Sequence, residues 1–471
     1  MYDAVNDKLK DECGVFGVYS KSGANVAQYA YYALYALQHR GQQSAGIAVS
    51  NGEEMKIHKG LGLLTDAFEL KDLDKLKGHI AIGHVKYAAE VEARIENAQP
   101  LLGSSKLGDI AIANNGSIVN ADVLKELLED SGYVFHTDSD VEVLMSIIAR
   151  NARRGIIKAI YGAVQAISGG FAVTIATKEQ LIGIRDPHGI RPLCIGKIEE
   201  DYILVSESCA LDAIGAEFIR DVMPGEIVVI SESGIESISY SERTQCETCA
   251  FEYIYFARPD SVMDGMSVHQ SRVNAGIKLF EQNPVDADVV IGVPDSGLSS
   301  AIGYAKASGI PYDIGFIKNK YIGRTFIAPD QKLRERAVSV KLNPLKINVE
   351  GKRVILIDDS IVRGTTSRHL VESLRRAGAK EVHFKIASPM VKYPCYFGID
   401  TPYRKDLIGA NKSIEEIRET IGVDSLDYLT IDNLLDSLST GCKNKGFCLG
   451  CLNGVYPVST PVEKGSNEYL D

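Results

Sequence analysis

Asp358 and Asp359 directly follow an apolar run, residues 354–357, and precede a turn rich in glycine and hydroxyl groups, residues 364–367. The apolar run predicts a strand that is buried on both faces, as in a parallel sheet. Ligands of open α/β sheets bind at the carboxyl ends of such strands. One aspartate would suffice to cap a following helix. The second carboxylate and the hydroxyl-rich turn therefore indicate a binding site.

The turn after these carboxylates predicts an anion site. Backbone N–H groups at the start of a helix, aided by the helix dipole, bind phosphate. Paired carboxylates suit sugar hydroxyls or Mg²⁺, which prefers oxygen ligands. The unit resembles the phosphoribosyl-diphosphate motif of type I phosphoribosyltransferases, which implies Mg²⁺ at Ser296, Asp358 and Asp359. The resemblance implies that phosphoribosyl diphosphate is bound by Asp295, Lys318, Arg324, Lys341, Asp358, Asp359, Gly364, Thr365, Thr366 and Ser367.

Cys13 is the second candidate for chemistry. A single cysteine is most often a small buried hydrophobe. This one follows a short polar leader, and the pair Asn115-Gly116 comes later in the chain. These segments resemble the glutaminase domain of the class II amidotransferases, which are N-terminal-nucleophile enzymes. The resemblance implies that residues 1–12 are a propeptide that is removed, and that the freed α-amine of Cys13 is the base for its own thiol.

The same resemblance assigns the other glutaminase residues. It implies an oxyanion hole formed by Asn115 and the N–H of Gly116, and glutamine binding by Arg40, Lys86 and Asp140. The segment around Lys86 departs from the family pattern GHVRYATAG, because lysine replaces the arginine and Ala89 replaces the threonine. Lysine cannot form the bidentate pair that arginine forms with a carboxylate. We therefore expect weak binding of glutamine.

The cysteines of the second half allow two interpretations. By spacing alone, the pairs Cys246/Cys249 and Cys448/Cys451 are typical of a zinc ribbon. The resemblance to amidophosphoribosyltransferases that contain an iron–sulfur cluster implies a different set. In that case a [4Fe–4S] cluster is held by Cys249, Cys395, Cys448 and Cys451, and Cys246 and Cys442 are extra. Zinc stays the alternative.

The two halves in this order resemble amidophosphoribosyltransferases along nearly the whole chain, including segments 251–261, 290–297, 318–329 and 394–400. Enzymes of this family release ammonia from glutamine. The ammonia displaces diphosphate from phosphoribosyl diphosphate and gives 5-phosphoribosylamine, the first committed step of purine synthesis. The resemblance also implies feedback inhibition by purine nucleotides and a homo-oligomer. Two alternatives stay open: a paralogue that prefers free ammonia, and a non-catalytic regulator that binds phosphoribosyl diphosphate.

These residues need two different frameworks. Up to about residue 240, short strands alternate with turns and two helical segments. With the resemblance, this predicts an α+β N-terminal-nucleophile glutaminase domain over residues 13–240, a sandwich of two sheets between helices. Later strands alternate with helices, as in a parallel sheet, which predicts an α/β type I phosphoribosyltransferase domain over residues 241–410. A helical tail, residues 411–471, carries the last cluster cysteines.

Composition limits the remaining classes of function. The chain has 471 residues and a net charge of −11. Its length predicts two or three domains, and its charge argues against nucleic acid and anionic membrane surfaces as partners. It has no apolar run of transmembrane length and no secretory signal, so we expect a cytoplasmic protein. In that reducing compartment cysteines stay thiols, nucleophiles or metal ligands, with Cys194 and Cys209 expected in the core.

Overall fold

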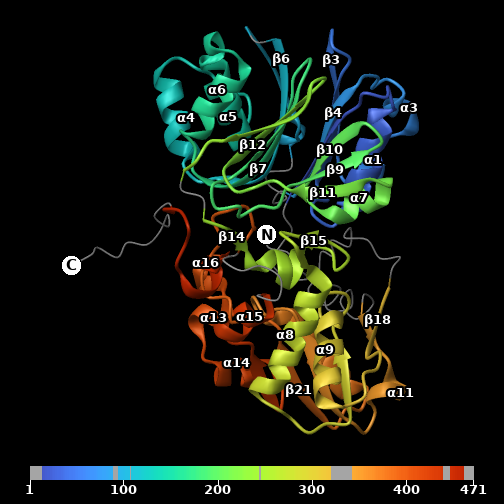
Figure 1. Cartoon of the computed structure of the whole chain (residues 1–471). Helices are drawn as coiled ribbons and strands as arrows, with labels where there is room; N and C mark the ends of the chain where they lie inside the picture. Colours follow the sequence, from blue (N-terminus) through green and yellow to red (C-terminus); the bar gives the residue numbers. More distant parts are fainter. Residues whose placement is uncertain are drawn as a thin grey trace, which may run out of the picture.

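The structure is a computed structural model that describes residues 13–87, 94–106, 108–242, 245–319, 342–401, 403–438 and 446–460. The predicted propeptide, residues 1–12, lies outside the described residues, as do Ala89, Arg324, Lys341 and Cys442. The molecule has two lobes, one above the other in Figure 1, with the first half of the chain in the upper lobe and the second half in the lower lobe.

The upper lobe contains two antiparallel sheets packed face to face. The first has seven strands in the order β11-β9-β10-β1-β4-β2-β3, and the second has six in the order β13-β12-β8-β7-β6-β5. The strands of the first sheet are β1 (Gly14–Tyr19), β2 (Ser44–Ser50), β3 (Met55–Leu61), β4 (Ile80–Lys86), β9 (Cys194–Ile198), β10 (Asp201–Val205) and β11 (Glu217–Asp221). Those of the second are β5 (Leu101–Ser105), β6 (Gly108–Ile118), β7 (Gly169–Ala176), β8 (Leu181–Arg185), β12 (Glu226–Ser231) and β13 (Gly234–Ser239).

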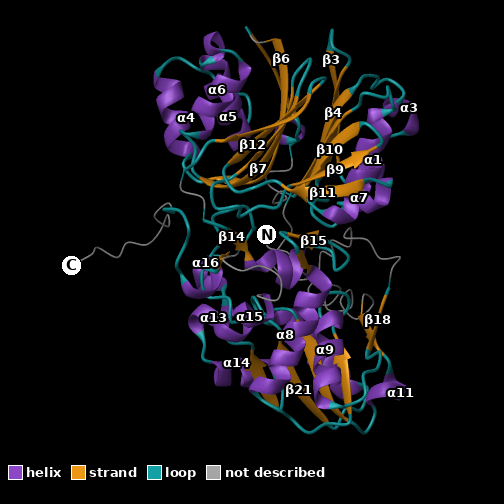
Figure 2. Cartoon of the chain, viewed as in Figure 1, coloured by secondary structure: helices purple, strands orange, loops and turns teal. Residues whose placement is uncertain are grey.

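Helices cover the outer faces of both sheets, as Figure 2 shows. Apolar side chains of α1 (Val26–Ala36) and α7 (Ser208–Ile214) pack against the first sheet. Those of α4 (Ala121–Asp130), α5 (Asp140–Arg150) and α6 (Ile156–Val164) pack against the second. A separate apolar cluster fills the space between the sheets. This arrangement confirms the predicted sandwich of two sheets between helices.

The lower lobe is built on a parallel sheet in the order β17-β20-β21-β22. Its strands are β17 (Val289–Gly292), β20 (Arg353–Asp358), β21 (Glu381–Ile386) and β22 (Ser425–Tyr428). Helices α8 (Val268–Gln282), α9 (Leu298–Ser308) and α15 (Ile431–Leu438) cover one face, and α12 (Thr365–Arg376) and α14 (Ile414–Ile421) the other. Residues 354–357 of β20 are fully buried, so the predicted α/β fold class and the predicted two-sided burial of this strand are confirmed.

Short elements complete the chain. The contact region between the lobes holds β14 (Glu247–Cys249), paired in parallel with β23 (Gly446–Cys448), and the π-helical turn Glu252–Phe256. The remaining short elements are α2 (Leu64–Ala67), α3 (Leu70–Leu73), β15 (Val262–Met263), β16 (Met266–Ser267), β18 (Phe316–Lys318), β19 (Leu342–Pro344), α11 (Lys346–Val349), α13 (Ile408–Asn411) and α16 (Gly450–Asn453). None of the helices in the described residues is long and apolar enough to cross a membrane.

Candidate functional site

The two carboxylates after β20 are held in a buried network of hydroxyl groups. The Asp358 and Asp359 residues are both only 1% exposed. Ser296, in the loop after β17, donates its hydroxyl to one oxygen of Asp359 at 2.5 Å, and Ser360 donates to the other at 2.6 Å. The backbone N–H of Asp359 donates to the Asp358 side chain at 2.9 Å. Parallel neighbours β17 and β20 end at the same edge, which is why the three predicted magnesium ligands lie together.

The start of α12 supplies a second part of this site. Gly364 has φ of +86° and precedes the first helical residue, Thr365. Side chains other than glycine rarely adopt this conformation. No acidic side chain lies in the first turn, which contains Thr365, Thr366 and Ser367. The backbone N–H groups of that turn, together with the helix dipole, can therefore bind an anion.

The remaining predicted residues of this half lie around the same edge or outside the described residues. Lys318, at the end of β18, forms an ion pair with Asp295, in the loop after β17. Both side chains are substantially exposed, at 40% and 69%. Exposed pairs of this kind are weak, so either group can exchange its partner for a ligand.

A cavity of about 570 Å³ opens beside Cys13 in the upper lobe. Of the predicted glutaminase residues, Cys13, Lys86, Gly116 and Asp140 line it. Asp140 is the first residue of α5, and its carboxylate accepts the backbone N–H of Ile118 at 2.8 Å. Burial raises the pKa of Asp140, an effect that this hydrogen bond and Lys86 oppose. A cationic ligand would restore the charged form, as the ammonium group of an amino acid would.

The predicted oxyanion pair carries unused hydrogen-bond donors. Asn115 is fully buried, and neither its Nδ2 nor its Oδ1 has a hydrogen-bond partner. Gly116 has φ of +118°, and an added Cβ would lie 2.1 Å from the carbonyl oxygen of Gly170. Only glycine fits this position. Unpaired buried amides are rare. The chain neighbours of Asn115, Asn114 and Gly116, line the cavity together with Cys13, so this amide is available to an oxyanion that develops there.

Arg40 does not line the cavity where the sequence placed it. Its side chain is fully buried behind Cys13 and donates through Nε to the Cys13 carbonyl oxygen at 3.0 Å. It also donates to Glu207 at 2.5 Å and to Glu252 at 2.6 Å. The enclosed guanidinium contacts the nucleophile's backbone, and the expected role of Arg40 in glutamine binding stays a prediction.

Lys86 does line the cavity, but as a single-point donor. Its Nζ donates to the carbonyl oxygen of Asn97 at 3.1 Å. Lys125 also lines the cavity. An ammonium group gives one charged contact on a flexible stem, without the planar fork of arginine.

The loop 395–400 of the second half of the chain forms part of the wall of the glutaminase cavity, and sequence reasoning missed this. Cys395 and Asp400 line the glutaminase cavity, and Asp400 accepts the Tyr87 hydroxyl at 3.3 Å. Buried Arg191, which bridges to Glu252, donates to the Phe397 carbonyl oxygen at 2.7 Å. The sequence did contain a signal, the segment 394–400 that includes the predicted cluster ligand Cys395. This segment is far from Cys13 in the sequence, so its position in the same cavity could not be predicted.

The four predicted cluster cysteines gather in one buried region. Cys249 and Cys448 are register partners in the parallel pair β14–β23. Burial raises the pKa of Cys451, with Cys395 and Cys448 as close electrostatic neighbours. Burial likewise raises the pKa of Cys448 to about 12. Within the described residues, no group of three or more His, Cys, Asp or Glu side chains is arranged to hold a single metal ion. Cys194 and Cys209 are buried in the core of the upper lobe, as expected.

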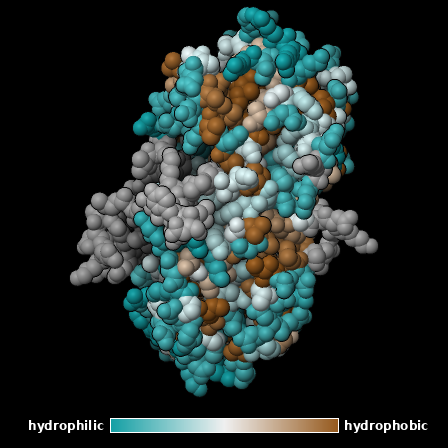
Figure 3. Space-filling view, turned by 90° about the vertical axis from the view of Figure 1, so that its left-hand side faces the viewer, coloured by the Kyte–Doolittle hydropathy of each residue, from teal (hydrophilic) through white to brown (hydrophobic). Residues whose placement is uncertain are grey.

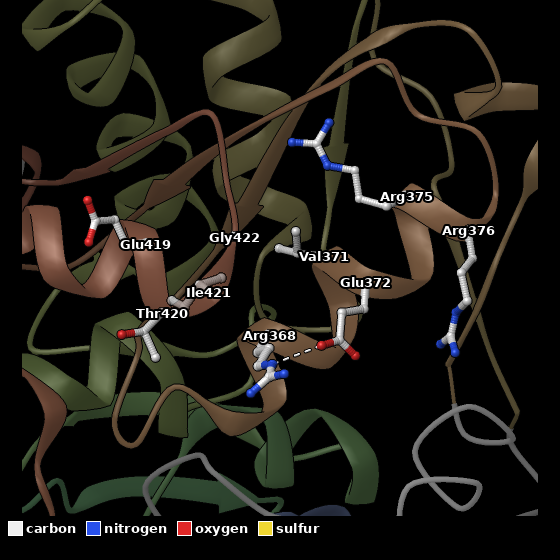
Figure 4. Close-up of a pocket in the computed structure, with 9 residues that line it drawn as sticks. All are labelled: Arg368, Val371, Glu372, Arg375, Arg376, Glu419, Thr420, Ile421 and Gly422. Atoms are coloured by element: carbon white, nitrogen blue, oxygen red, sulfur yellow. Dashed lines mark hydrogen bonds and ion pairs between the residues drawn. The ribbon is translucent and has the colours of Figure 1, made fainter.

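A second cavity, of about 600 Å³, lies between α12 and α14 and belongs to neither site. Figure 4 shows that its charged side chains point in different directions instead of toward one point. Arg368 is paired with Glu372 at 2.8 Å, and Arg375 with Asp424 at 2.5 Å. The mixed charges and the existing pairs describe a solvated surface groove.

Comparisons with known proteins identify both domains. A family model described as a glutamine amidotransferase domain matches residues 87–213, and one described as a phosphoribosyl transferase domain matches residues 269–389. The amidophosphoribosyltransferase of Archaeoglobus fulgidus is 47% identical, over 96% of this chain and 99% of its own length. That of Bacillus subtilis is 48% identical, over 95% of this chain and 94% of its own length.

Two solved structures have the same fold over almost the full length. One is the glutamine phosphoribosylpyrophosphate amidotransferase of B. subtilis complexed with ADP and GMP, with a TM-score of 0.90, 47% identity, and coverage of 96% of this chain and 98% of the other. The second, described as the allosteric regulatory enzyme of purine biosynthesis, has a TM-score of 0.91, 47% identity, and coverage of 96% and 97%. Because both domains are matched and the relatives are similar over nearly their full length, the chain belongs to the amidophosphoribosyltransferase family.

Proposed function

We propose that this chain makes 5-phosphoribosylamine from glutamine and phosphoribosyl diphosphate, with Cys13 in one site and the Asp358–Asp359 unit in the other. The observation that carries this proposal is that one chain contains both sites. The first has the unpartnered Asn115 amide and a cavity lined by Cys13, and the second has two buried carboxylates and the start of α12. We take residues 13–240, 241–410 and 411–471 as its functional parts, since the last strand of the second sheet ends at Ser239.

In the glutaminase site, the Cys13 thiol attacks the carboxamide carbon of glutamine as the α-amine removes its proton. The amine passes this proton to the leaving nitrogen, which departs as ammonia, and water then hydrolyses the thioester to glutamate. The amide Nδ2–H of Asn115 and the N–H of Gly116 donate to the oxyanion. Arg40 positions Cys13 through its carbonyl oxygen. This chemistry requires that the mature chain begins at Cys13, which intact-mass spectrometry of the purified enzyme would check.

In the transferase site, ammonia attacks C1 of the ribose and diphosphate leaves. The oxygen donors of Ser296, Asp358 and Asp359 fit Mg²⁺, because hard cations prefer oxygen ligands and these carboxylates are buried beside one another. Bound Mg²⁺ would neutralise charge on the diphosphate. The first turn of α12 holds the 5-phosphate through its N–H groups. Lys318 and Asp295, with the predicted Arg324 and Lys341, complete the binding of the substrate.

The cysteine cluster fits a [4Fe–4S] group better than zinc. A tetrahedral zinc site brings four donors to about 2.0–2.3 Å from one ion, whereas a cubane cluster binds each thiolate through a different iron atom and needs less convergence. Cys395 is an electrostatic neighbour of Cys451 in this region, whereas the Cys246 thiol contacts Thr248. A bound cluster would join the tail, the loop 395–400 and β14.

A paralogue that prefers free ammonia is the second candidate. The observation that favours it is the composition of the glutamine cavity, where Lys86 makes a single donation and Arg40 is enclosed.

The B. subtilis relative was solved with ADP and GMP, and we extend purine-nucleotide binding and inhibition to this chain on that basis.

We also propose a homo-oligomer. Apolar patches interrupt the hydrophilic surface in Figure 3, both on the upper lobe and near the middle of the molecule. Exposed apolar side chains of α4, for example Val123 at 61% and Leu127 at 58%, contribute to such a surface. Contiguous apolar patches mark interaction sites. Analytical ultracentrifugation would show a monomer if this proposal is wrong.

Substitution of one residue in each site tests the proposed function. Cys13→Ala is expected to abolish the glutamine-dependent rate and to leave the ammonia-dependent rate unchanged, because free ammonia bypasses the thiol. Asp359→Asn is expected to reduce both rates strongly, since both need the bound sugar diphosphate. Steady-state assays with glutamine and with ammonium chloride provide the measurement. Glutamine-dependent turnover by the Cys13→Ala variant would show that the nucleophile is assigned wrongly.

A further inference from the structure

The layer between the two sheets of the upper lobe is mainly apolar but contains three polar side chains. In a strand, alternate side chains share a face. Ile80 and Ile82 of β4, Ala111 and Ala113 of β6, and Ala172 and Ala176 of β7 all belong to the cluster between the sheets. The same alternation places His84, Asn115 and Thr174 in this layer. All three residues are fully buried.

These three polar side chains have hydrogen-bonding atoms without a partner. His84 Nδ1, Asn115 Nδ2 and Oδ1, and Thr174 Oγ1 are buried and make no hydrogen bond. All lie close to Asn114, because His84 contacts its carbonyl oxygen and Thr174 is the register partner of Ala113. An unpaired buried polar atom destabilises the folded chain. The unpaired Nδ1 of His84 and the unpaired amide of Asn115 therefore indicate a pair that is completed only in the reacting complex.

The hydrogen bond of His84 determines its tautomer. Its Nε2 lies 3.0 Å from the carbonyl oxygen of Asn114, which can only accept, so Nε2 carries the proton. Burial lowers the pKa of His84 to about 3, so the ring is neutral. Its Nδ1 is therefore an acceptor. The donors in the same layer are the Asn115 amide and the Thr174 hydroxyl.

We propose that His84 is a positioning residue for the oxyanion hole. Its Nδ1 accepts one amide hydrogen of Asn115, directly or through one buried water. The inference rests on the proposed function of Asn115. The second Nδ2 hydrogen then points to the oxyanion. Without an acceptor at Nδ1, the amide can turn, and its Oδ1 would meet the negative charge. His84 also fixes the Asn114 peptide that precedes the donor, so one ring aligns both the backbone and the side chain.

Three single variants test this inference. His84→Leu is expected to lower glutamine-dependent kcat by roughly 10- to 100-fold, less than the 10²–10³ that loss of an oxyanion donor costs. The KM for glutamine and the ammonia-dependent rate should stay unchanged. His84→Gln, whose amide can donate and accept, should restore most of the loss. Thr174→Val is the matched control, because it removes polarity from the same layer without touching the Asn115 amide, and it should retain nearly full kcat.

A double-mutant cycle with Asn115→Ala gives the decisive result. In the Asn115→Ala background, His84→Leu is expected to change kcat by less than about twofold, because the group it aligns is already gone. Multiplicative losses would overturn the inference, as would a Thr174→Val variant as slow as His84→Leu. If Asn115→Ala alone keeps full kcat, the oxyanion assignment itself fails, and the inference fails with it.

An aldehyde analogue of glutamine separates alignment from general damage. It forms a tetrahedral adduct with the Cys13 thiol and so needs the oxyanion hole. Its Kd should rise in His84→Leu by the same factor as kcat falls, whereas the Kd of glutamate, the product, should stay constant. An equal loss of affinity for both compounds would mean that His84 is merely structural.

Discussion

At the residue scale, the glutamine cavity differs from the family pattern at the carboxylate-binding position. Lys86 offers one charged contact, and Arg40, the other candidate in the sequence, is enclosed by Glu207 and Glu252. Burial opposes ionisation of Glu207, but His39 and Arg40 outweigh it and hold the pKa of Glu207 below its usual range. Arg40 is thus fixed in place between Glu207 and Glu252, with its Nε on the backbone carbonyl oxygen of the nucleophile.

We predict a high KM for glutamine beside an ordinary KM for phosphoribosyl diphosphate. One charged hydrogen bond contributes about 1.5–3 kcal/mol, which corresponds to roughly ten- to a hundredfold in affinity. Replacing residues 86–97 with the family loop should lower the KM for glutamine, whereas Lys86→Arg alone should do less because Ala89 belongs to the same loop. Steady-state kinetics measures both. Tight glutamine binding by the natural chain would contradict this and make Lys125, which lines the cavity, the next cation to replace.

Asp140 gives a prediction about pH. Burial raises the pKa of this carboxyl, so it takes up a proton above the ordinary value of about 3.9. The protonated form cannot pair with the ammonium group of glutamine. The KM for glutamine should therefore rise as the pH falls through the range in which this carboxyl takes up its proton, a range that lies above that of ordinary carboxyls. Asp140→Asn should have a high KM that does not change over this range. A wild-type KM independent of pH would remove Asp140 from amine binding.

At the element scale, the start of α12 depends on one glycine. Gly364 has φ of +86°, and a Cβ there would lie 2.8 Å from Ile408 Cδ1. Alanine costs about 1–2 kcal/mol in this conformation and displaces the first turn. We predict that Gly364→Ala raises the KM for phosphoribosyl diphosphate with both nitrogen donors.

Gly378, just beyond the other end of α12, provides the matched control. It also has a positive φ, of +95°, and a Cβ there would lie 3.1 Å from Glu350 Cγ. Gly378→Ala should lower the melting temperature by a similar amount and leave the KM for phosphoribosyl diphosphate unchanged. Equal KM values for both variants would show that α12 does not bind the phosphate.

At the scale of the whole molecule, the cysteine region connects the tail to both lobes. We predict a brown protein with about four irons per chain if four thiolates hold a [4Fe–4S] cluster. Cys395→Ser should remove the cluster, whereas Cys246→Ser should retain it. A zinc ribbon made of the two Cys-x-x-Cys pairs would reverse these results, because it uses Cys246 and does not need Cys395. Iron and zinc analysis of anaerobically purified protein, with visible absorbance, distinguishes the two cases.

The same variants test how the loop 395–400 connects the lobes. Because this loop lines the glutamine cavity, loss of the cluster in Cys395→Ser is expected to raise the KM for glutamine more than the KM for ammonia. The pairing of Arg191 with Phe397 and of Tyr87 with Asp400 supports this difference.

The amino-acid sequence by itself determined the chemistry that is contained in short segments. Residues 354–367 include a buried strand, two carboxylates and a helix start, so their order along the chain already sets their order in space. The same holds for the alternation that predicted the parallel sheet, and for the pair Asn115-Gly116. Local hydrogen bonding and the periodicity of side chains are properties of contiguous residues, so they can be predicted without knowledge of the fold.

Only the tertiary structure decided which distant residues meet and how much water reaches them. It enclosed Arg40 between two carboxylates, brought Ser296 to Asp359, and placed Cys395 in the wall of the glutamine cavity. It also left His84 Nδ1 buried without a partner. These features depend on strand order, register and burial, which arise from contacts between segments far apart in the chain. A side chain's type states what it can bond to, but its partners and its charge depend on the neighbours that folding supplies.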